Sequence, residues 1–527
     1  MASPRDLFAA YLRSNRLARD SLPECAAEAG AALIDAQQSE LFFLHGVLKT
    51  GVIFSSIHGL TALALPPLRV GRKQRRVIDS WCRKSVRSKS TFLITLLRDW
   101  RLITQAWRKA RRKPELVNLK IDGIHIGPYI WDACYAARSE RLSFRQRLKI
   151  LYLIVCHRAD CAVVSAYRVK LMIVGDPAYR TGMLYELCRA RSIPCINAVN
   201  VEILQMHKYY LPSEFGLHFR DVPQSLVARL ATSRTAVSKI DAYFSARFNG
   251  RIQQHDVVRA FGRDKIRRTR ADLIAEHDLD GDLPLVFVMA HVLSDAPHNY
   301  SPLLHLDFED WLGRTVTALA SNARINFVVK EHPSVDLYGE AGILRRILVR
   351  LGCGDRLVQS DLHTKSVLEH ADVVLTCGGT IGIEAASLGI PVILAGRPPY
   401  AGKGFTIEPK NAEEYGRLLA SGIESVQRLT EAQIGCAKRV AYVLFDLFDN
   451  EALSLELGGV TYVRGKEFPI NDFFRNVIVE NEVPLMRQRV YQRLREFHES
   501  SDTSIINYRK LRDLLEIASP GATSAAS

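Results

Sequence analysis

The sequence predicts an α/β fold, because short apolar runs of the kind found in buried parallel strands alternate with helical segments. The clearest example lies between Ala371 and Thr406, where an apolar run, a glycine turn, a helix and a second apolar run follow one another. A further apolar run, Ile325–Val329, ends directly before a polar run that begins at Lys330. The alternation is visible from Val117 onward, which indicates open α/β sheets.

Length and composition are those of an ordinary globular protein. The 527 residues suffice for two or three domains, and 47% are hydrophobic and 24% charged. Ten cysteines show no spacing typical of zinc sites, so we expect reduced thiols. The first residues carry charges throughout and lack the apolar core of a signal peptide. We therefore expect a cytoplasmic protein, with peripheral attachment to the inner face of the cytoplasmic membrane left open.

Residues 1–115 are predicted to form a basic helical region, part of which completes the first domain. The segment Arg69–Lys113 has sixteen lysines and arginines against two aspartates, which is nearly the whole net charge of +15. Trp81, Trp100 and Trp107 lie among these charges, a pattern typical of a helix on an anionic membrane or glycolipid. A helix with its apolar stripe in the core is the alternative. Nucleic-acid binding is not expected, because no recognisable motif accompanies the charge.

The apolar segment Leu41–Leu68 is long enough to raise the question of a membrane span. It contains Lys49 and several glycines, and it ends in a Pro-Pro pair. A span needs about 20 uninterrupted apolar residues. We therefore predict a helix followed by buried strands.

The first α/β domain is predicted at residues 116–270. Its strand Lys170–Val174 ends at Asp176, and ligands bind outside the carboxyl ends of parallel strands. Asp176 is thus the first candidate for a general base that activates an acceptor hydroxyl. It could equally cap the turn that it begins. The predicted acceptor contacts are Asp132, which is also the fallback carboxylate, Tyr179 and Arg180.

A phosphate site is predicted in the second domain, residues 271–450. The turn Cys377–Thr380 precedes a helix, and free N–H groups at such a place can bind an anion. Thr380 is the predicted N-cap of that helix, and an ordinary strand-to-helix connection is the alternative. His332, at the end of another strand, can donate a hydrogen bond to the same phosphate. The loop after the strand Leu285–Ala290 directs Ser294 and Asp295 towards the same edge of the sheet.

Three segments resemble the bacterial capsule and surface-polysaccharide glycosyltransferases. They are KEHP at Lys330–Pro333, GGTIGIEAASLGIPVI at Gly378–Ile393 and PPYAGKGFT at Pro398–Thr406. This group includes the capsule β-Kdo transferases and, more distantly, CDP-glycerol polymerases and sialyltransferases with a His-Pro motif. Weaker similarity extends over about residues 117–410, in the segments Lys120–Ala133, Val174–Ile196 and Val288–Asn299.

The resemblance implies a GT-B-like fold, in which two Rossmann-like domains face one another across a cleft. The first domain would bind the acceptor and the second the donor, and residues 451–527 would add a helical extension with a disordered end. Asp176 and His332 would be catalytic. The implied donor contacts are Lys330, His332, Pro333, Gly378, Gly379, Thr380, Glu384, Ser294, Asp295 and Lys403. Lys403 stands where the β-Kdo transferases often have an aromatic residue, so the donor sugar stays open.

The expected function is transfer of a sugar from a nucleotide-sugar donor, CMP-Kdo-like or other, to a surface polysaccharide or glycolipid. No cofactor or metal is expected, because a helix dipole and a histidine can replace a divalent cation at the phosphate. Inversion or retention at the anomeric centre is open. The alternatives are a CDP-alditol phosphate transferase and a non-catalytic module that binds a nucleotide sugar or glycan.

Overall fold

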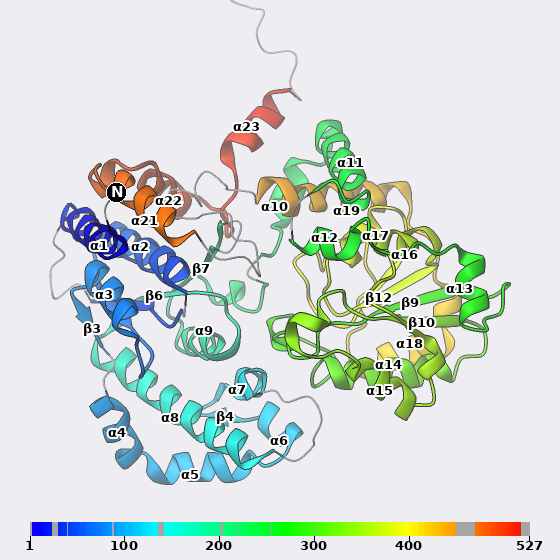
Figure 1. Ribbon diagram of the computed structural model, residues 1–527, viewed down its shortest axis with the longest axis horizontal. Helices are drawn as coiled ribbons and strands as arrows, with labels where there is room; N and C mark the ends of the chain where they lie inside the picture. Colours follow the sequence, from blue (N-terminus) through cyan, green and yellow to red (C-terminus); the bar gives the residue numbers. More distant parts are fainter. Residues whose placement is uncertain are drawn as a thin grey trace, which may run out of the picture. The chain divides into compact units, whose positions relative to one another are not determined.

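The computed structural model describes residues 3–23, 30–38, 40–86, 89–134, 142–200, 204–218, 220–252, 255–300, 302–448 and 469–517. The chain divides into two compact units. Unit 1 consists of Met1–Phe215 and Phe448–Asn507, and unit 2 of Gly216–Leu447 and Tyr508–Ser527 (Figure 1). Each unit is a sheet covered by helices, which confirms the predicted α/β class. The predicted cleft between two such domains stays a prediction.

Unit 1 contains a Rossmann-like sheet. Its strands are β1 (Ala31–Asp35), β2 (Thr61–Leu65), β3 (Lys84–Ser85), β6 (Val169–Val174), β7 (Cys195–Asn200) and β8 (Leu204–Tyr209). They lie in the order β3-β2-β1-β6-β7-β8, and all pairs are parallel except β7 with β8. The strand order reverses between β1 and β6, the place where open α/β sheets bind ligands. A small antiparallel pair, β4 (Lys120–Ile121) with β5 (Ile124–His125), stands apart.

Helix α2 (Leu41–Ile57) is the central helix of unit 1 and is buried along most of its length. It packs on β1, β2 and β7 and on helix α22 from the far end of the chain. Its one charged side chain, Lys49, is fully buried and lies 3.0 Å from the carboxylate of Glu480. The other helices of the unit are α1 (Pro4–Asp20), α3 (Arg72–Trp81), α4 (Lys89–Arg98), α5 (Trp100–Lys109), α6 (Lys113–Val117), α7 (Gly127–Cys134), α8 (Phe144–Ala166), α9 (Tyr179–Arg191), α21 (Ile470–Glu480) and α22 (Arg489–Glu499).

The predicted helix followed by a buried strand is confirmed by α2 and β2. Over the described ranges, every helix is too short or too polar to cross a bilayer. The cysteines outside the gaps are free thiols, and all of them except Cys436 are buried.

The units divide the chain differently from the predicted domains. Strands β1 to β3, half of the first sheet, come from residues 1–115, and α21 and α22 from the predicted C-terminal extension complete the same core. The run AALID of β1 is too short for its periodicity to separate strand from helix. Residues 216–270 form α10 to α13 in unit 2 and are not part of the first domain. The predicted turn after residue 456 and the chain end lie outside the described residues.

Unit 2 repeats the architecture. Its parallel sheet has the order β11-β10-β9-β12-β13, so the order reverses between β9 and β12. The strands are β9 (Leu285–Met289), β10 (Asn326–Lys330), β11 (Leu357–Val358), β12 (Val373–Thr376) and β13 (Val392–Leu394). The helices are α10 (Gln224–Arg229), α11 (Arg234–Phe248), α12 (His255–Phe261), α13 (Arg270–Glu276), α14 (Phe308–Ala320), α15 (Ile343–Arg350), α16 (Thr364–His370), α17 (Ile381–Ala386), α18 (Ala412–Ser421), α19 (Glu431–Tyr442) and α23 (Tyr508–Ile517).

Buried histidines make the fold sensitive to acid. Burial lowers the pKa of His157 to about 4 and the pKa of His207 and His291 to about 3. The unfolded chain takes up these protons near pH 6.5, so stability is complete above that pH and falls as the pH drops towards 4. Each such proton changes the free energy of unfolding by roughly 1.4 kcal/mol per pH unit. We expect cooperative acid unfolding between about pH 4 and pH 6.5, followed by circular dichroism.

The variant His207→Asn is the control for this titration. His207 Nδ1 lies 2.8 Å from Ser504 Oγ, and an asparagine amide can keep that contact. The variant should unfold at lower pH with one proton fewer taken up. If the free energy of unfolding fell equally steeply with decreasing pH in both proteins, His207 would not contribute to the acid sensitivity.

Candidate active site

A cavity of about 240 Å³ lies at the carboxyl ends of β9, β10 and β12 in unit 2. It sits where the strand order reverses, the expected ligand position in such sheets. The structure brings together there most of the predicted donor residues. These are Asp295, Lys330, His332, Pro333, Gly379, Thr380 and Glu384.

His332 is held as a neutral hydrogen-bond donor. Its Nδ1 atom accepts a hydrogen bond of 3.1 Å from the Ser334 N–H, which leaves the ring proton on Nε2. Burial, followed by the charges of Lys330 and Arg259, lowers the pKa of His332 to about 4. At neutral pH the ring therefore offers one N–H group and carries no charge.

Lys330 supplies positive charge at the same place. It is the last residue of β10 and only 1% exposed. Burial, and next the charge of Lys265, lowers its pKa to about 8, so the ammonium group is still mostly protonated at pH 7. Across the described ranges no carboxylate forms an ion pair with it. The charge is thus available to an anion in the cavity.

The glycine turn is built differently from the prediction. The N–H groups of Gly378 and Gly379 donate to Thr376 Oγ1, over 3.3 and 3.1 Å. With both lone pairs occupied, Oγ1 donates its own proton to His291 Nε2, 3.2 Å away. These two N–H groups therefore stabilise the turn, and the predicted contact of Gly378 and Gly379 with the phosphate stays a prediction. Gly378 lines a separate cavity of about 110 Å³.

Thr380 stands at the N-cap of α17, as predicted, but its side chain makes no capping hydrogen bond. The side chain is exposed and lines the cavity of about 240 Å³ as well as the one of about 110 Å³. Its hydroxyl is consequently placed to contact a ligand. At the other end of α17, Gly389 has φ +81°, the left-handed conformation expected after a helix.

Glu384 forms a buried ion pair that the sequence did not reveal. Its Oε1 atom accepts a hydrogen bond of 3.0 Å from Arg247 Nε, and both side chains are almost fully buried. The Arg247 guanidinium also lies over the rings of Phe261 and Phe445, at 5.7 and 5.4 Å from their centroids. Arg247 comes from α11, far away in the sequence. It fixes Glu384 in the wall of the cavity.

Glu340 organises the loop after β9. Its carboxylate accepts hydrogen bonds from the N–H groups of Leu293 and Ser294, over 2.7 and 2.8 Å. Asp295, which lines the cavity, accepts one from the Tyr338 hydroxyl over 3.1 Å. Ser294 lies outside the cavity lining, and its predicted donor contact stays a prediction.

Lys403 also lies outside the lining of both cavities. Its Nζ atom is 3.6 Å from Asp221 Oδ2, and both side chains are mostly buried. Burial raises the pKa of Asp221 to about 6 in spite of the nearby charges of Lys403 and Arg397. A donor contact of Lys403 remains a prediction.

The predicted acceptor residues of unit 1 differ in their exposure to solvent. Asp176 is exposed at the end of β6, and Tyr179, with φ +50°, starts α9. Arg180 turns inward, where Nη1 lies 3.5 Å from the Tyr152 hydroxyl and Nη2 lies 3.8 Å from Asp160 Oδ2. Asp132 is buried in α7. Exposed Asp176 and Tyr179 are therefore more accessible than Arg180 and Asp132.

A further carboxylate, missed in the sequence, ends β1 beside the reversal of the first sheet. Asp35 is fully buried, and its Oδ2 atom accepts a hydrogen bond of 2.9 Å from the Thr181 hydroxyl. Asp35 falls in residues 1–115, which were predicted to form a helical region, so a strand end was not considered there. The only signal was the apolar run that precedes Asp35.

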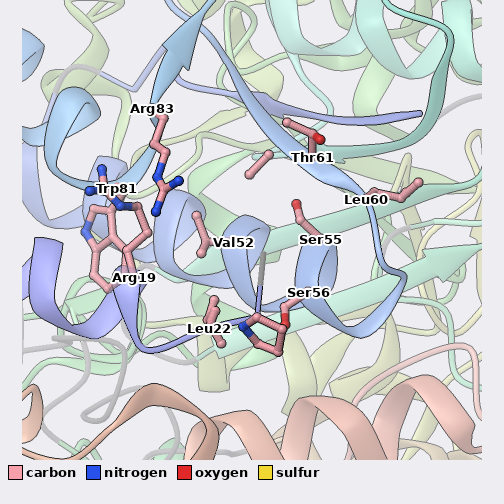
Figure 2. Close-up of a pocket in the computed structure, with 11 residues that line it drawn as sticks. Arg19, Leu22, Val52, Ser55, Ser56, Leu60, Thr61, Trp81 and Arg83 are labelled. Carbon is pink, nitrogen blue, oxygen red and sulfur yellow. The ribbon is translucent and has the colours of Figure 1, made fainter. Parts of the chain in front are cut away.

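A cavity of about 360 Å³ in unit 1 lies at the opposite edge of its sheet, where the strands begin (Figure 2). Its lining includes Val52 and Ser55 of α2 and residues Leu60 and Thr61 at the amino end of β2. Arg19 in its wall is held by Asp20 at 2.8 Å. Because ligands of open sheets bind at the carboxyl edge, this cavity is not the predicted acceptor site.

In the described part of the chain, no three His, Cys, Asp or Glu side chains are grouped to hold a metal ion. The expected independence of metal stays a prediction.

Comparison with known proteins gives one specific match. Residues 265–432 match the family model described as "Capsule polysaccharide biosynthesis protein". No curated protein matches the chain significantly.

Solved structures show weaker likeness. The β-Kdo 2,4-transferase KpsC of Thermosulfurimonas dismutans is 17% identical, with 51% of this chain and 79% of that chain covered and a TM-score of 0.31. A glycosyltransferase of Rickettsia africae is 9% identical over 89% of this chain and 98% of that chain, with a TM-score of 0.26. HepE of Anabaena, in complex with UDP-glucose, is 11% identical over 81% of this chain and 98% of that chain, with a TM-score of 0.27. Likeness at these scores is too weak to identify an activity.

The matched residues include every strand of the second sheet and helix α17, and thus most of the cavity wall. The predicted resemblance to capsule polysaccharide biosynthesis proteins is therefore confirmed over residues 265–432.

Proposed function

We propose that the protein is a glycosyltransferase of capsule polysaccharide synthesis whose unit 2 binds a nucleotide-sugar donor. The observation that carries this proposal is the cavity at the carboxyl ends of β9, β10 and β12. Lys330, His332 and Thr380 line it together, which provides a cation, a neutral N–H donor and a hydroxyl for one phosphate group. The family match over the same strands supports the assignment to capsule synthesis.

The departing nucleotide carries negative charge that grows in the transition state. His332 Nε2–H and the Lys330 ammonium group stabilise that charge, as preformed donors do in a site shielded from water. Arg247 holds Glu384 so that its carboxylate can accept hydrogen bonds from donor hydroxyls. With these groups the reaction proceeds without a metal ion.

The acceptor hydroxyl needs a base, and we assign this role to Asp176. It is an exposed carboxylate at the carboxyl end of β6, and Tyr179 beside it contacts the acceptor. The base removes the hydroxyl proton while the oxygen attacks the anomeric carbon and the nucleotide leaves. A retaining route, in which a carboxylate first forms a glycosyl-enzyme, uses the same donor site.

Nucleotide binding tests the donor site. Thermal shift with CMP, CDP, UDP and GDP should show stabilisation of the wild type by one of them, about 2.7 kcal/mol at a hundredfold excess over Kd. In His332→Ala one hydrogen bond to a charged group is lost, so affinity should fall roughly 10- to 100-fold. His370, which bonds to the Arg268 carbonyl outside the cavity, gives the control variant His370→Ala with an unchanged nucleotide shift.

The identity of the nucleotide and the product separates the remaining functions. CMP favours a Kdo- or sialic-acid-like donor, and UDP or GDP a hexose donor. If CDP binds and the product contains a phosphodiester bond, the protein is an alditol phosphate transferase and not a sugar transferase. If no nucleotide binds, the donor site is refuted and a non-catalytic glycan-binding role takes its place.

A further inference from the structure

Helix α4 presents an apolar face to the outside of unit 1. Leu93, Ile94 and Leu97 follow helical spacing, and together with Trp100 at the start of α5 they are 54–67% exposed. The opposite face of α4 packs on α8, where the Phe92 ring lies 5.8 Å from the Tyr152 ring. Helix α4 is therefore apolar on both faces, and α8 covers only one of them (Figure 1). We call these four residues the α4 patch.

Helix α5 places basic side chains beside the α4 patch. Its outward positions at helical spacing are Arg101, Gln105 and Arg108, and Lys109 is exposed as well. The Arg101 guanidinium lies 5.5 Å from the centroid of the Trp100 ring, which joins the basic and apolar parts of the surface. In the described ranges, Arg101, Arg108 and Lys109 form no ion pair with a carboxylate.

The single acidic residue between Lys89 and Lys113 does not neutralise this surface. Asp99 accepts hydrogen bonds from Arg98 and Arg158, over 2.8 and 2.9 Å, and Arg98 above all lowers its pKa to about 2. The negative charge of Asp99 is thus paired with these two arginines. The surface beside the α4 patch stays strongly positive.

A surface of exposed aliphatic side chains next to unpaired cations fits an anionic lipid bilayer better than nucleic acid or a second copy of the chain. An anionic bilayer takes leucine and tryptophan side chains into its interface and attracts each nearby basic residue by roughly 1 kcal/mol. Nucleic acid would match the charge but would leave three aliphatic side chains against phosphates. A second copy in a two-fold contact would bring the same basic residues together, which is unfavourable.

We propose that the α4 patch, with the basic face of α5, docks the protein on an anionic phospholipid bilayer. Leu93, Ile94, Leu97 and Trp100 enter the interface, and Arg101 and Arg108 contact the lipid phosphates. Docking keeps the enzyme at the surface where a lipid-linked acceptor is found. The proposal is independent of the donor site, because it uses only residues of unit 1.

Vesicle flotation tests the docking surface. The full chain should float with vesicles that contain phosphatidylglycerol, remain in solution with phosphatidylcholine alone, and dissociate as salt rises. Leu93→Ser with Leu97→Ser should lower vesicle affinity roughly tenfold or more through lost apolar burial. Arg101→Gln with Arg108→Gln should lower it roughly tenfold and reduce the salt dependence.

The matched control is Val479→Ser with Val483→Ser. These exposed apolar residues of unit 1 flank Glu480 and lie next to Glu482, so their surface is apolar without being basic. The control should float as the wild type does, and all variants should keep the wild-type nucleotide shift. Equal flotation of the Leu93/Leu97 variant and the wild type would overturn the proposal. The proposal would also be overturned if the wild type did not bind vesicles but formed a dimer, and the Leu93/Leu97 variant stayed monomeric.

Discussion

The variant Arg247→Met is expected to lower the free energy of unfolding by about 3–5 kcal/mol, because it leaves the carboxylate of Glu384 buried without its partner. The pair joins Arg247 Nε and Glu384 Oε1 over 3.0 Å with both side chains almost fully buried. Replacement of both residues by methionine removes the isolated charge and should restore most of the stability. Urea unfolding of the single and double variants measures the effect.

An exposed pair of the same geometry supplies the control. Arg314 Nε lies 3.0 Å from Asp310 Oδ1, in the same unit, with the arginine largely in solvent. Because exposed pairs of this spacing contribute only about 0.3–0.5 kcal/mol, Arg314→Met should be nearly neutral. If Arg247→Met were equally mild, the Glu384 carboxylate would not be paired as described. The double methionine variant should also lose nucleotide affinity, since Glu384 lines the cavity.

The variant Lys330→Met is expected to stabilise the fold and to abolish nucleotide binding. The pKa of Lys330 falls from 10.5 to about 8 on folding, mainly through burial. At pH 7 the native state therefore carries a charge that burial disfavours by about 2–3 kcal/mol, and methionine removes it. The same charge attracts the donor phosphate, so its loss should weaken nucleotide binding beyond detection. Chemical unfolding and the thermal shift measure the two effects on one sample.

The pH dependence identifies the charge as the cause. Between pH 8 and 10.5 the unfolded chain binds a proton at this position that the native state has released, so wild-type stability gains with rising pH. The difference in the free energy of unfolding between Lys330→Met and the wild type should therefore decrease between pH 8 and pH 10.5. Lys410→Met, at an exposed position of the same unit, should show no difference at any pH. If the difference in the free energy of unfolding stayed constant over this pH range, the stabilisation by Lys330→Met would result from packing alone.

Local patterns were sufficient to predict four of the five strands of the second sheet, all except β11, and half of its site. The run INFVV ends directly before Lys330, and the turn before α17 has a strand on one side and a helix on the other, so both positions follow from short sequence windows. Parallel strands bring their carboxyl ends to one edge, and His332 and Thr380 accordingly share a cavity. Strand β9 lies between the two strands that carry them, an order that the sequence alone did not give.

The missed features depend on contacts between distant parts of the chain. Arg247 meets Glu384, and Glu340 meets the loop at Ser294, without a motif that links them. The hydroxyl of Thr376 accepts hydrogen bonds from the N–H groups of Gly378 and Gly379, a contact that no motif in the sequence indicates. Strand β1 was taken for helix, since five apolar residues give no reliable period.

The interleaved order of the two units affects how the chain folds during synthesis. Unit 1 consists of Met1–Phe215 together with Phe448–Asn507, and the larger segment of unit 2, Gly216–Leu447, lies between them in the sequence. The core of unit 1 includes Phe473, Leu494 and Phe497, which leave the ribosome about 260 to 280 residues after Phe215. At typical synthesis rates, roughly 15 to 60 s pass between the synthesis of Phe215 and that of these residues. During this time α2 exposes the face that later packs against α22. Helices α21 and α22, made after the larger segment of unit 2, thus complete the unit that was begun first.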